Sequence, residues 1–109
     1  MDDSPFLAIK SLETQLSGVL SRLDLFELPK AEQKLVDTLR RNVADARLDI
    51  RDYELSETRD EQLRKAQAAK KRLERVRKGV LAASEYNVFG AVDVAQLTAQ
   101  LEQISDNLK

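Results

Sequence analysis

The sequence contains no cysteine, histidine or tryptophan, and only 3 glycines and 2 prolines among its 109 residues. Without cysteine there is no disulfide framework, no thiol nucleophile and no zinc–thiolate site. Without histidine, the commonest general base and transition-metal ligand is missing. So few glycines and prolines argue against an all-β fold, which needs many tight turns. We therefore expect a single small helical domain over residues 1–109.

Signals for export and for membrane insertion are also missing. Residues 1–5 are acidic and no long apolar run follows them, so a secretory signal is not predicted. The apolar stretches are too short to span a bilayer. A formal net charge of −1 gives no general attraction to nucleic acid or to anionic lipid. Together with the lack of cysteine, these features favour a cytoplasmic protein that does not bind membranes.

The sequence does contain apolar side chains that follow one another at alternating spacings of three and four residues. This spacing places them on one face of a helix. No segment shows the strict alternation that is typical of a half-buried strand. The four segments with helical spacing predict helices over residues 5–25, 29–54, 58–85 and 93–107.

Helix boundaries are predicted from capping residues. Pro5 and Pro29 suit the first position of a helix, where the missing N–H has no partner to lose. Thr58 with Glu61 matches the reciprocal capping box, and Asp93 is expected to cap the last helix. Because neither glycine nor proline separates the second and third segments, one continuous helix remains an alternative there.

Four amphipathic helices with short connections predict an all-α fold, an antiparallel up-down four-helix bundle. The second and third helices would each be about 39 Å long, against about 30 and 24 Å for the first and fourth, so their hairpin should project at its turn, residues 53–62. The expected core contains Leu16, Leu39, Val43, Leu73, Val76, Leu97 and Leu101. The end opposite the turn is expected to be closed by Phe26, Leu28, Tyr86, Val88 and Phe89.

A second group of side chains lies on the predicted second helix, opposite its core face. The group comprises Ala44, Leu48 and Leu55, flanked by Arg41 and Arg51. A neighbouring helix of the bundle would cover these residues in one interpretation. In the other, they bind a protein partner or a second copy of the chain. A two-fold contact of this face with itself predicts a homodimer.

The third predicted helix carries a concentration of positive charge. Residues 59–78 include nine basic and three acidic side chains, and Arg64, Lys71, Arg75 and Lys78 share one face. This face is a candidate site for the phosphates of nucleic acid. No aromatic side chain lies among these charges for base stacking, and no helix-turn-helix pattern is present. A solvated face, paired in part with acidic residues of the second helix, is therefore favoured.

Two further patterns have a structural and a functional interpretation. Asp45, Asp49 and Asp52 share a helix face, but without histidine or a calcium-loop pattern a salt-bridged surface is favoured over a metal site. Residues 86–90 contain Asn87 and Gly90, which suits a helix C-cap with hydrophobic closure. In the alternative, Phe89 is exposed there as a docking residue.

The sequence shows no pairing of nucleophile and base, and no glycine-rich phosphate loop. We therefore expect no enzyme activity, no cofactor and no small-molecule substrate. The expected function is that of a non-catalytic protein–protein interaction module, an adaptor or chaperone-like bundle. The alternative is a nucleic-acid-associated protein that uses the basic face of the third helix.

Overall fold

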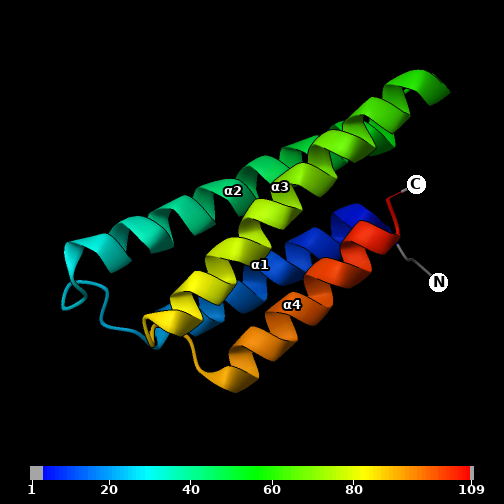
Figure 1. Ribbon diagram of the computed structural model, residues 1–109. Helices are drawn as coiled ribbons and strands as arrows, with labels where there is room; N and C mark the ends of the chain where they lie inside the picture. Colours follow the sequence, from blue (N-terminus) through cyan, green and yellow to red (C-terminus); the bar gives the residue numbers. More distant parts are fainter. Residues whose placement is uncertain (1–3, 109) are drawn as a thin grey trace.

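The computed structural model describes residues 4–108, and within this range it contains four α-helices and no strand. The helices are α1 (Pro5–Ser21), α2 (Lys30–Leu55), α3 (Arg59–Glu85) and α4 (Ala91–Asp106). Within the described residues the helices pack in a ring, α1 on α2, α2 on α3, α3 on α4 and α4 on α1, and the backbones of the diagonal pairs stay farther apart (Figure 1). The predicted antiparallel up-down bundle is confirmed.

The α2–α3 hairpin is the longest part of the molecule. Its 26- and 27-residue helices exceed the 17 and 16 residues of α1 and α4. As predicted, the turn of the hairpin extends past the ends of the two shorter helices (Figure 1). The described chain measures 47 × 27 × 18 Å. No helix within it has both the length and the apolar composition that crossing a bilayer requires.

The core forms where the four apolar stripes face one another. All seven predicted core residues are at most 4% exposed: Leu16, Leu39, Val43, Leu73, Val76, Leu97 and Leu101. α3 continues through Gly79 without a break. A Cβ atom at Gly79 would lie 3.0 Å from Cδ1 of Leu39, so the missing side chain lets α2 and α3 pack closely at this level.

The prediction for the end of the first helix is wrong. α1 ends at Ser21, and not at Leu25. The Ser21 hydroxyl donates a hydrogen bond to the carbonyl oxygen of Gly18 (2.8 Å), and Oδ1 of Asp24 accepts one from the backbone N–H of Phe26 (3.2 Å). The Asp24 bond to the N–H two residues on stabilises a turn, which competes with continued helical bonding. The apolar spacing that identifies this helix continues past its last residue, to Leu23 and Phe26.

The predicted closure of the bundle is correct only in part. Val88 and Phe89 are buried, at 5% and 4% exposure, and Leu28 packs against the core. Phe26 is 96% exposed and Tyr86 is 60% exposed, so neither closes the bundle. The sequence places Phe26 at this end because Phe26 continues the three-and-four spacing of the first helix.

α2 and α3 are separate helices, so the alternative of one continuous helix is wrong. The Thr58 side chain accepts a hydrogen bond from the backbone N–H of Glu61 at 3.2 Å, as the capping box predicts. Ser56 has an extended conformation and ends α2. At the other end, Pro29 is the N-cap of α2 and Lys30 is its first residue, one position later than predicted.

The C-terminus of α3 has the left-handed cap that its sequence predicts. Asn87 has φ 61°, in the left-handed region. The N–H of Val88 bonds to the carbonyl of Ala83 at 2.8 Å, and the N–H of Asn87 bonds to that of Ser84 at 3.0 Å. These two bonds define a Schellman motif. Because Phe89 is buried, the alternative of an exposed docking residue is wrong.

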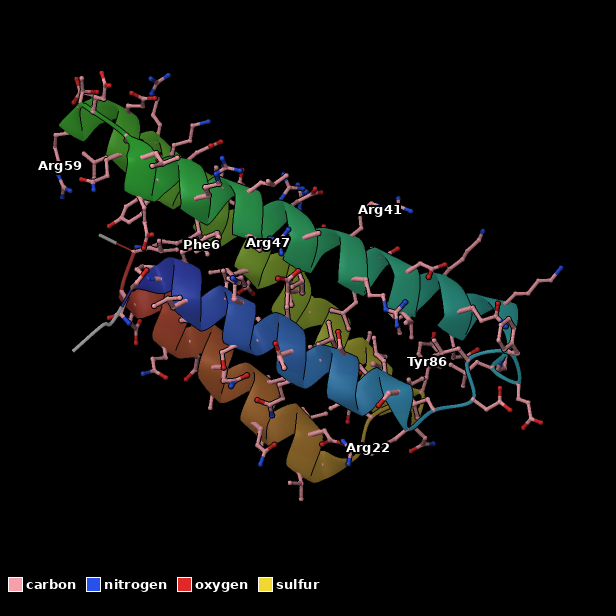
Figure 2. The ribbon with its side chains drawn as sticks, turned by 180° about the vertical axis from the view of Figure 1, so that it is seen from behind. Phe6, Arg22, Arg41, Arg47, Arg59 and Tyr86 are labelled. Carbon is pink, nitrogen blue, oxygen red and sulfur yellow. The ribbon has the colours of Figure 1, made fainter. Side chains whose placement is uncertain are left out.

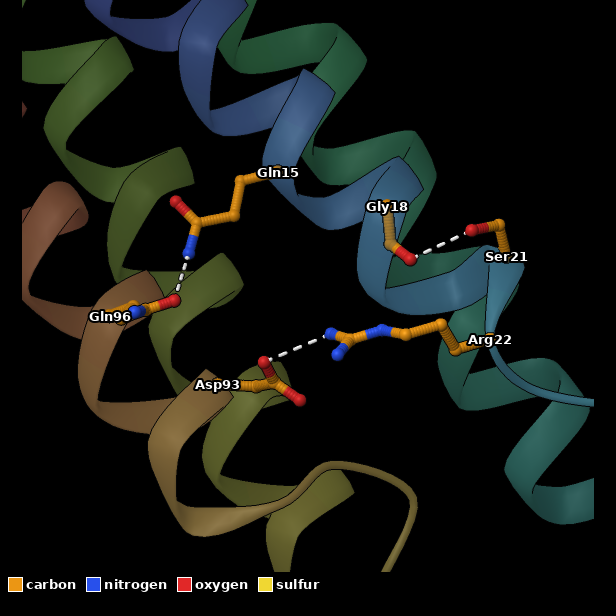
Figure 3. Close-up of polar contacts among 6 residues, drawn as sticks. All are labelled: Gln15, Gly18, Ser21, Arg22, Asp93 and Gln96. Atoms are coloured by element: carbon orange, nitrogen blue, oxygen red, sulfur yellow. Dashed lines mark hydrogen bonds and ion pairs between the residues drawn. The ribbon is translucent and has the colours of Figure 1, made fainter.

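The start of the last helix differs from its prediction. α4 begins at Ala91 with Gly90 as N-cap, so Asp93 lies in the first turn and is not the cap. Its carboxylate instead pairs with Arg22, just after the end of α1, at 3.1 Å (Figure 3). An acidic side chain is favourable in the first turn of a helix, where the helix dipole is positive.

Candidate interaction surface on α2

Six residues of α2 form a line on the side of the helix that faces away from the core. They follow one another at spacings of four and three, which keeps them on one helical face. We call this line the outward stripe; it comprises Asp37, Arg41, Ala44, Leu48, Arg51 and Leu55. It includes all five residues that the sequence marks as candidates for partner binding.

The outward stripe is accessible to solvent. Leu48 is 51% exposed and Leu55 is 66% exposed, so no helix of the bundle buries them. Arg41 and Arg51 are exposed, and Ala44 is partly covered. In the view from behind, Arg41 points away from the other helices (Figure 2). The interpretation in which a neighbouring helix covers the two leucines does not hold.

The flank of α2 that faces α1 is held by polar contacts. Arg47 pairs with Glu13 of α1 at 3.1 Å. The carboxylate of Glu54 accepts a hydrogen bond from the hydroxyl of Ser4 at 2.7 Å and another from the backbone N–H of Phe6 at 3.3 Å. Glu54 thus satisfies a donor at the N-terminus of α1. No local sequence pattern indicates this role of Glu54, because its partners are about fifty positions away.

The flank of α2 that faces α3 carries the row of aspartates. Asp45 and Asp49 lie 3.4 and 3.6 Å from guanidinium nitrogens of Arg72, and Asp52 lies 3.6 Å from Nζ of Lys65. The aspartates therefore bind the neighbouring helix through ion pairs. A salt-bridged surface is the interpretation that the sequence favours for this row. Across residues 4–108, no three His, Cys, Asp or Glu side chains converge as metal ligands.

The positive charge of α3 is divided between two sides of the helix. Arg72 and Lys65 pair with α2, as the sequence predicts for part of this charge. The other four basic residues are exposed, and none of them makes an ion pair in the described part of the chain: Arg64, Lys71, Arg75 and Lys78. The structure thus leaves this candidate phosphate-binding face open to solvent.

One ion pair within α3 alters the titration of its partners. A hydrogen bond from Arg77 lowers the pKa of Glu74 below its usual value. The same bond raises the pKa of Arg77. Both side chains lie at the surface, where such a pair contributes little to stability.

A feature that the sequence analysis missed lies beside the start of α2. Phe26 projects from the turn that Asp24 stabilises, where the N–H of Glu27 also bonds to the Asp24 carbonyl at 3.1 Å. Phe26 lines a cleft with Leu25, Gln33, Val36 and Asp37. Because Asp37 belongs to both, this cleft, which we call the Phe26 cleft, is continuous with the outward stripe. Asp24 is the sequence signal that favours a turn here.

Comparisons of the chain with protein-family models, with curated proteins and with solved structures give no significant match.

Proposed function

We propose that this protein is a non-catalytic protein–protein interaction module that uses the outward stripe of α2, and that it self-associates as a homodimer through this stripe. The observation that carries the proposal is the exposure of Leu48 and Leu55, at 51% and 66%, on one face of a long helix. Burying a leucine side chain contributes roughly 1.5–3 kcal/mol, so a protein surface that covers both would gain a substantial free energy.

The composition of the stripe also supports protein binding. Arginine is enriched at protein interfaces, and Arg41 and Arg51 flank the two leucines. The aliphatic part of an arginine side chain can cover apolar surface while its guanidinium reaches a carboxylate. The stripe of a second copy presents apolar side chains and the carboxylate of Asp37 at helical spacing, and these groups can meet the leucines and an arginine.

The test is a change of charge at the centre of the stripe. We expect the wild type to sediment as a dimer at micromolar concentrations, and Leu48→Lys to sediment as a monomer with an unchanged helical circular dichroism spectrum. Val92→Lys is the matched control, because Val92 is 71% exposed on α4 and α4 does not contact α2 within the described residues. It should remain a dimer. A wild type that stays monomeric at high concentration would contradict self-association, and loss of helix in Leu48→Lys would assign Leu48 a role in the fold.

A second function is supported by the basic face of α3. Four exposed cations at helical spacing, without ion-pair partners among residues 4–108, suit the phosphates of nucleic acid. If this face binds nucleic acid, fluorescence anisotropy of a labelled duplex and of a labelled single strand should rise at low salt and fall steeply as salt increases. The double variant Lys71→Glu/Arg75→Glu should abolish the signal. No binding at low salt would reject this function and leave the first one intact.

A further inference from the structure

Two oppositely charged residues of the outward stripe are placed symmetrically about Ala44. Asp37 and Arg51 lie seven residues before and after Ala44, two helical turns in each direction, and they carry opposite charges. Gln33, in the Phe26 cleft, and Leu55 lie eleven residues before and after it. Neither Asp37 nor Arg51 is engaged in an ion pair within the described chain.

We propose that the partner of the outward stripe is a second copy of this chain whose α2 runs antiparallel to the first, with a two-fold axis at Ala44. This inference rests on the proposed function and specifies its geometry. In this arrangement Asp37 of each copy pairs with Arg51 of the other. Leu55 of each copy enters the Phe26 cleft of the other.

Charge complementarity selects the antiparallel direction. If the two α2 helices ran parallel, Asp37 would face Asp37 and Arg51 would face Arg51, and like charges across an interface are unfavourable. The antiparallel direction replaces both repulsions with two identical attractions. It also brings the basic start of α2, with the exposed Lys34, toward the exposed Glu57 in the hairpin turn of the other copy.

The size of the side chains in the outward stripe favours a two-fold axis at Ala44. Where two helices cross, a small residue allows their backbones to approach closely. Ala44 is the smallest residue of the outward stripe and lies midway between Asp37 and Arg51. Leu48 then meets the other copy near Arg40 and Arg41, both exposed, whose aliphatic parts can cover it.

The Phe26 cleft gives the contact an apolar anchor at each end. Phe26 is the most exposed of the large apolar side chains in the described chain, at 96%, and the turn at Asp24 holds its backbone. Leu55 is 66% exposed. Aromatic side chains that fill a partner's pocket dominate many interfaces. Each copy supplies one Phe26 and one Leu55, so two such anchors form, one on either side of the axis.

Cross-linking tests this geometry directly, because the natural chain has no cysteine. Two Cα atoms must lie within about 7 Å for a disulfide to form, a condition that a residue on the two-fold axis meets. We expect oxidised Ala44→Cys to run as a covalent dimer on a non-reducing gel. The matched control Ala99→Cys, at an exposed alanine on α4, should remain a monomer on the same gel.

A charge exchange and a truncation complete the test. Asp37→Arg should raise the dissociation constant of the dimer by about tenfold, and Asp37→Arg/Arg51→Asp should restore it. Phe26→Ala should weaken the dimer by about tenfold or more, whereas Val92→Ala should not. Two results would overturn the antiparallel arrangement while self-association stands. In the first, the wild type is a dimer but Ala99→Cys cross-links and Ala44→Cys does not. In the second, the charge exchange fails to restore the affinity of the dimer. If the wild type is monomeric at every concentration, the proposed self-association itself fails.

Discussion

The contact between Leu39 of α2 and the backbone of α3 at Gly79 offers a quantitative test of the core. Leu39 is 1% exposed, and its Cδ1 atom would lie 3.0 Å from a Cβ atom at Gly79. Leu39→Ala removes this side chain from a packed interior and should cost roughly 2–5 kcal/mol. The free energy of unfolding of a domain this size is about 5–15 kcal/mol, so the variant should still fold, with a clearly lower stability.

The effect of Gly79→Ala should depend on Leu39. Alanine in place of glycine in a helix interior gains roughly 0.8–1 kcal/mol from propensity alone. In the wild type the added methyl group presses on Leu39, and adjusting a packed core costs about 1–3 kcal/mol, so the net change should be near zero or destabilising. In the Leu39→Ala background the methyl group meets no such contact and fills part of the cavity. Gly79→Ala should then stabilise by about 1 kcal/mol, so the two sites couple by about 1 kcal/mol or more.

Urea unfolding followed by circular dichroism measures all four members of this cycle. Gly18→Ala is the control, because a Cβ atom at Gly18 would meet nothing within 4 Å. It should stabilise by roughly 0.5–1 kcal/mol in both backgrounds. If Gly79→Ala changed the free energy of unfolding equally in the wild type and in the Leu39→Ala variant, the close packing of α2 on α3 at this level would be refuted.

Two further substitutions test how helix ends are stabilised. Asn87 adopts a left-handed backbone, so Asn87→Ala should lower the melting temperature by the equivalent of about 1–2 kcal/mol, whereas Asn87→Gly should hold or raise it; a fall with glycine would contradict the cap. Glu54 accepts bonds from Ser4 and from the N–H of Phe6, so Glu54→Ala should cost about 1 kcal/mol in urea unfolding. The exposed Glu57 in the adjacent turn supplies the control Glu57→Ala, and equal losses in the two variants would mean that Glu54 has no capping role.

The bundle could be predicted from the sequence because the patterns that specify its helices involve residues close together in the chain. Three-and-four spacing identifies the core face of each helix, and Leu16, Leu39 and Leu97 all lie where that spacing places them. Capping residues identify most helix ends within two positions. The break at residues 56–58, which contains no glycine or proline, is predicted by the capping box of Thr58 and Glu61, with one continuous helix as the alternative.

The errors arise where local spacing and local hydrogen bonding disagree. Leu23 and Phe26 continue the apolar rhythm of α1, but the helix ends at Ser21 and the Asp24 carboxylate accepts a bond from the N–H of Phe26 in the turn that follows. Asp93 has the sequence of an N-cap, yet it lies in the first turn and pairs with Arg22, about seventy residues away. Such pairings depend on tertiary structure, which a periodic pattern does not report.

The same limit explains why the surface was only half predicted. Helical spacing indicated that Leu48 and Leu55 face away from the core, and the structure shows both exposed. It did not indicate that Phe26 would be exposed at the opposite end of the same helix, because Phe26 was expected to close the bundle there. The end of α1 at Ser21 is what exposes Phe26 and places it beside Asp37. A local break in one helix therefore extends the apolar surface of the next, and it places an apolar residue near each end of α2, as the proposed antiparallel dimer requires.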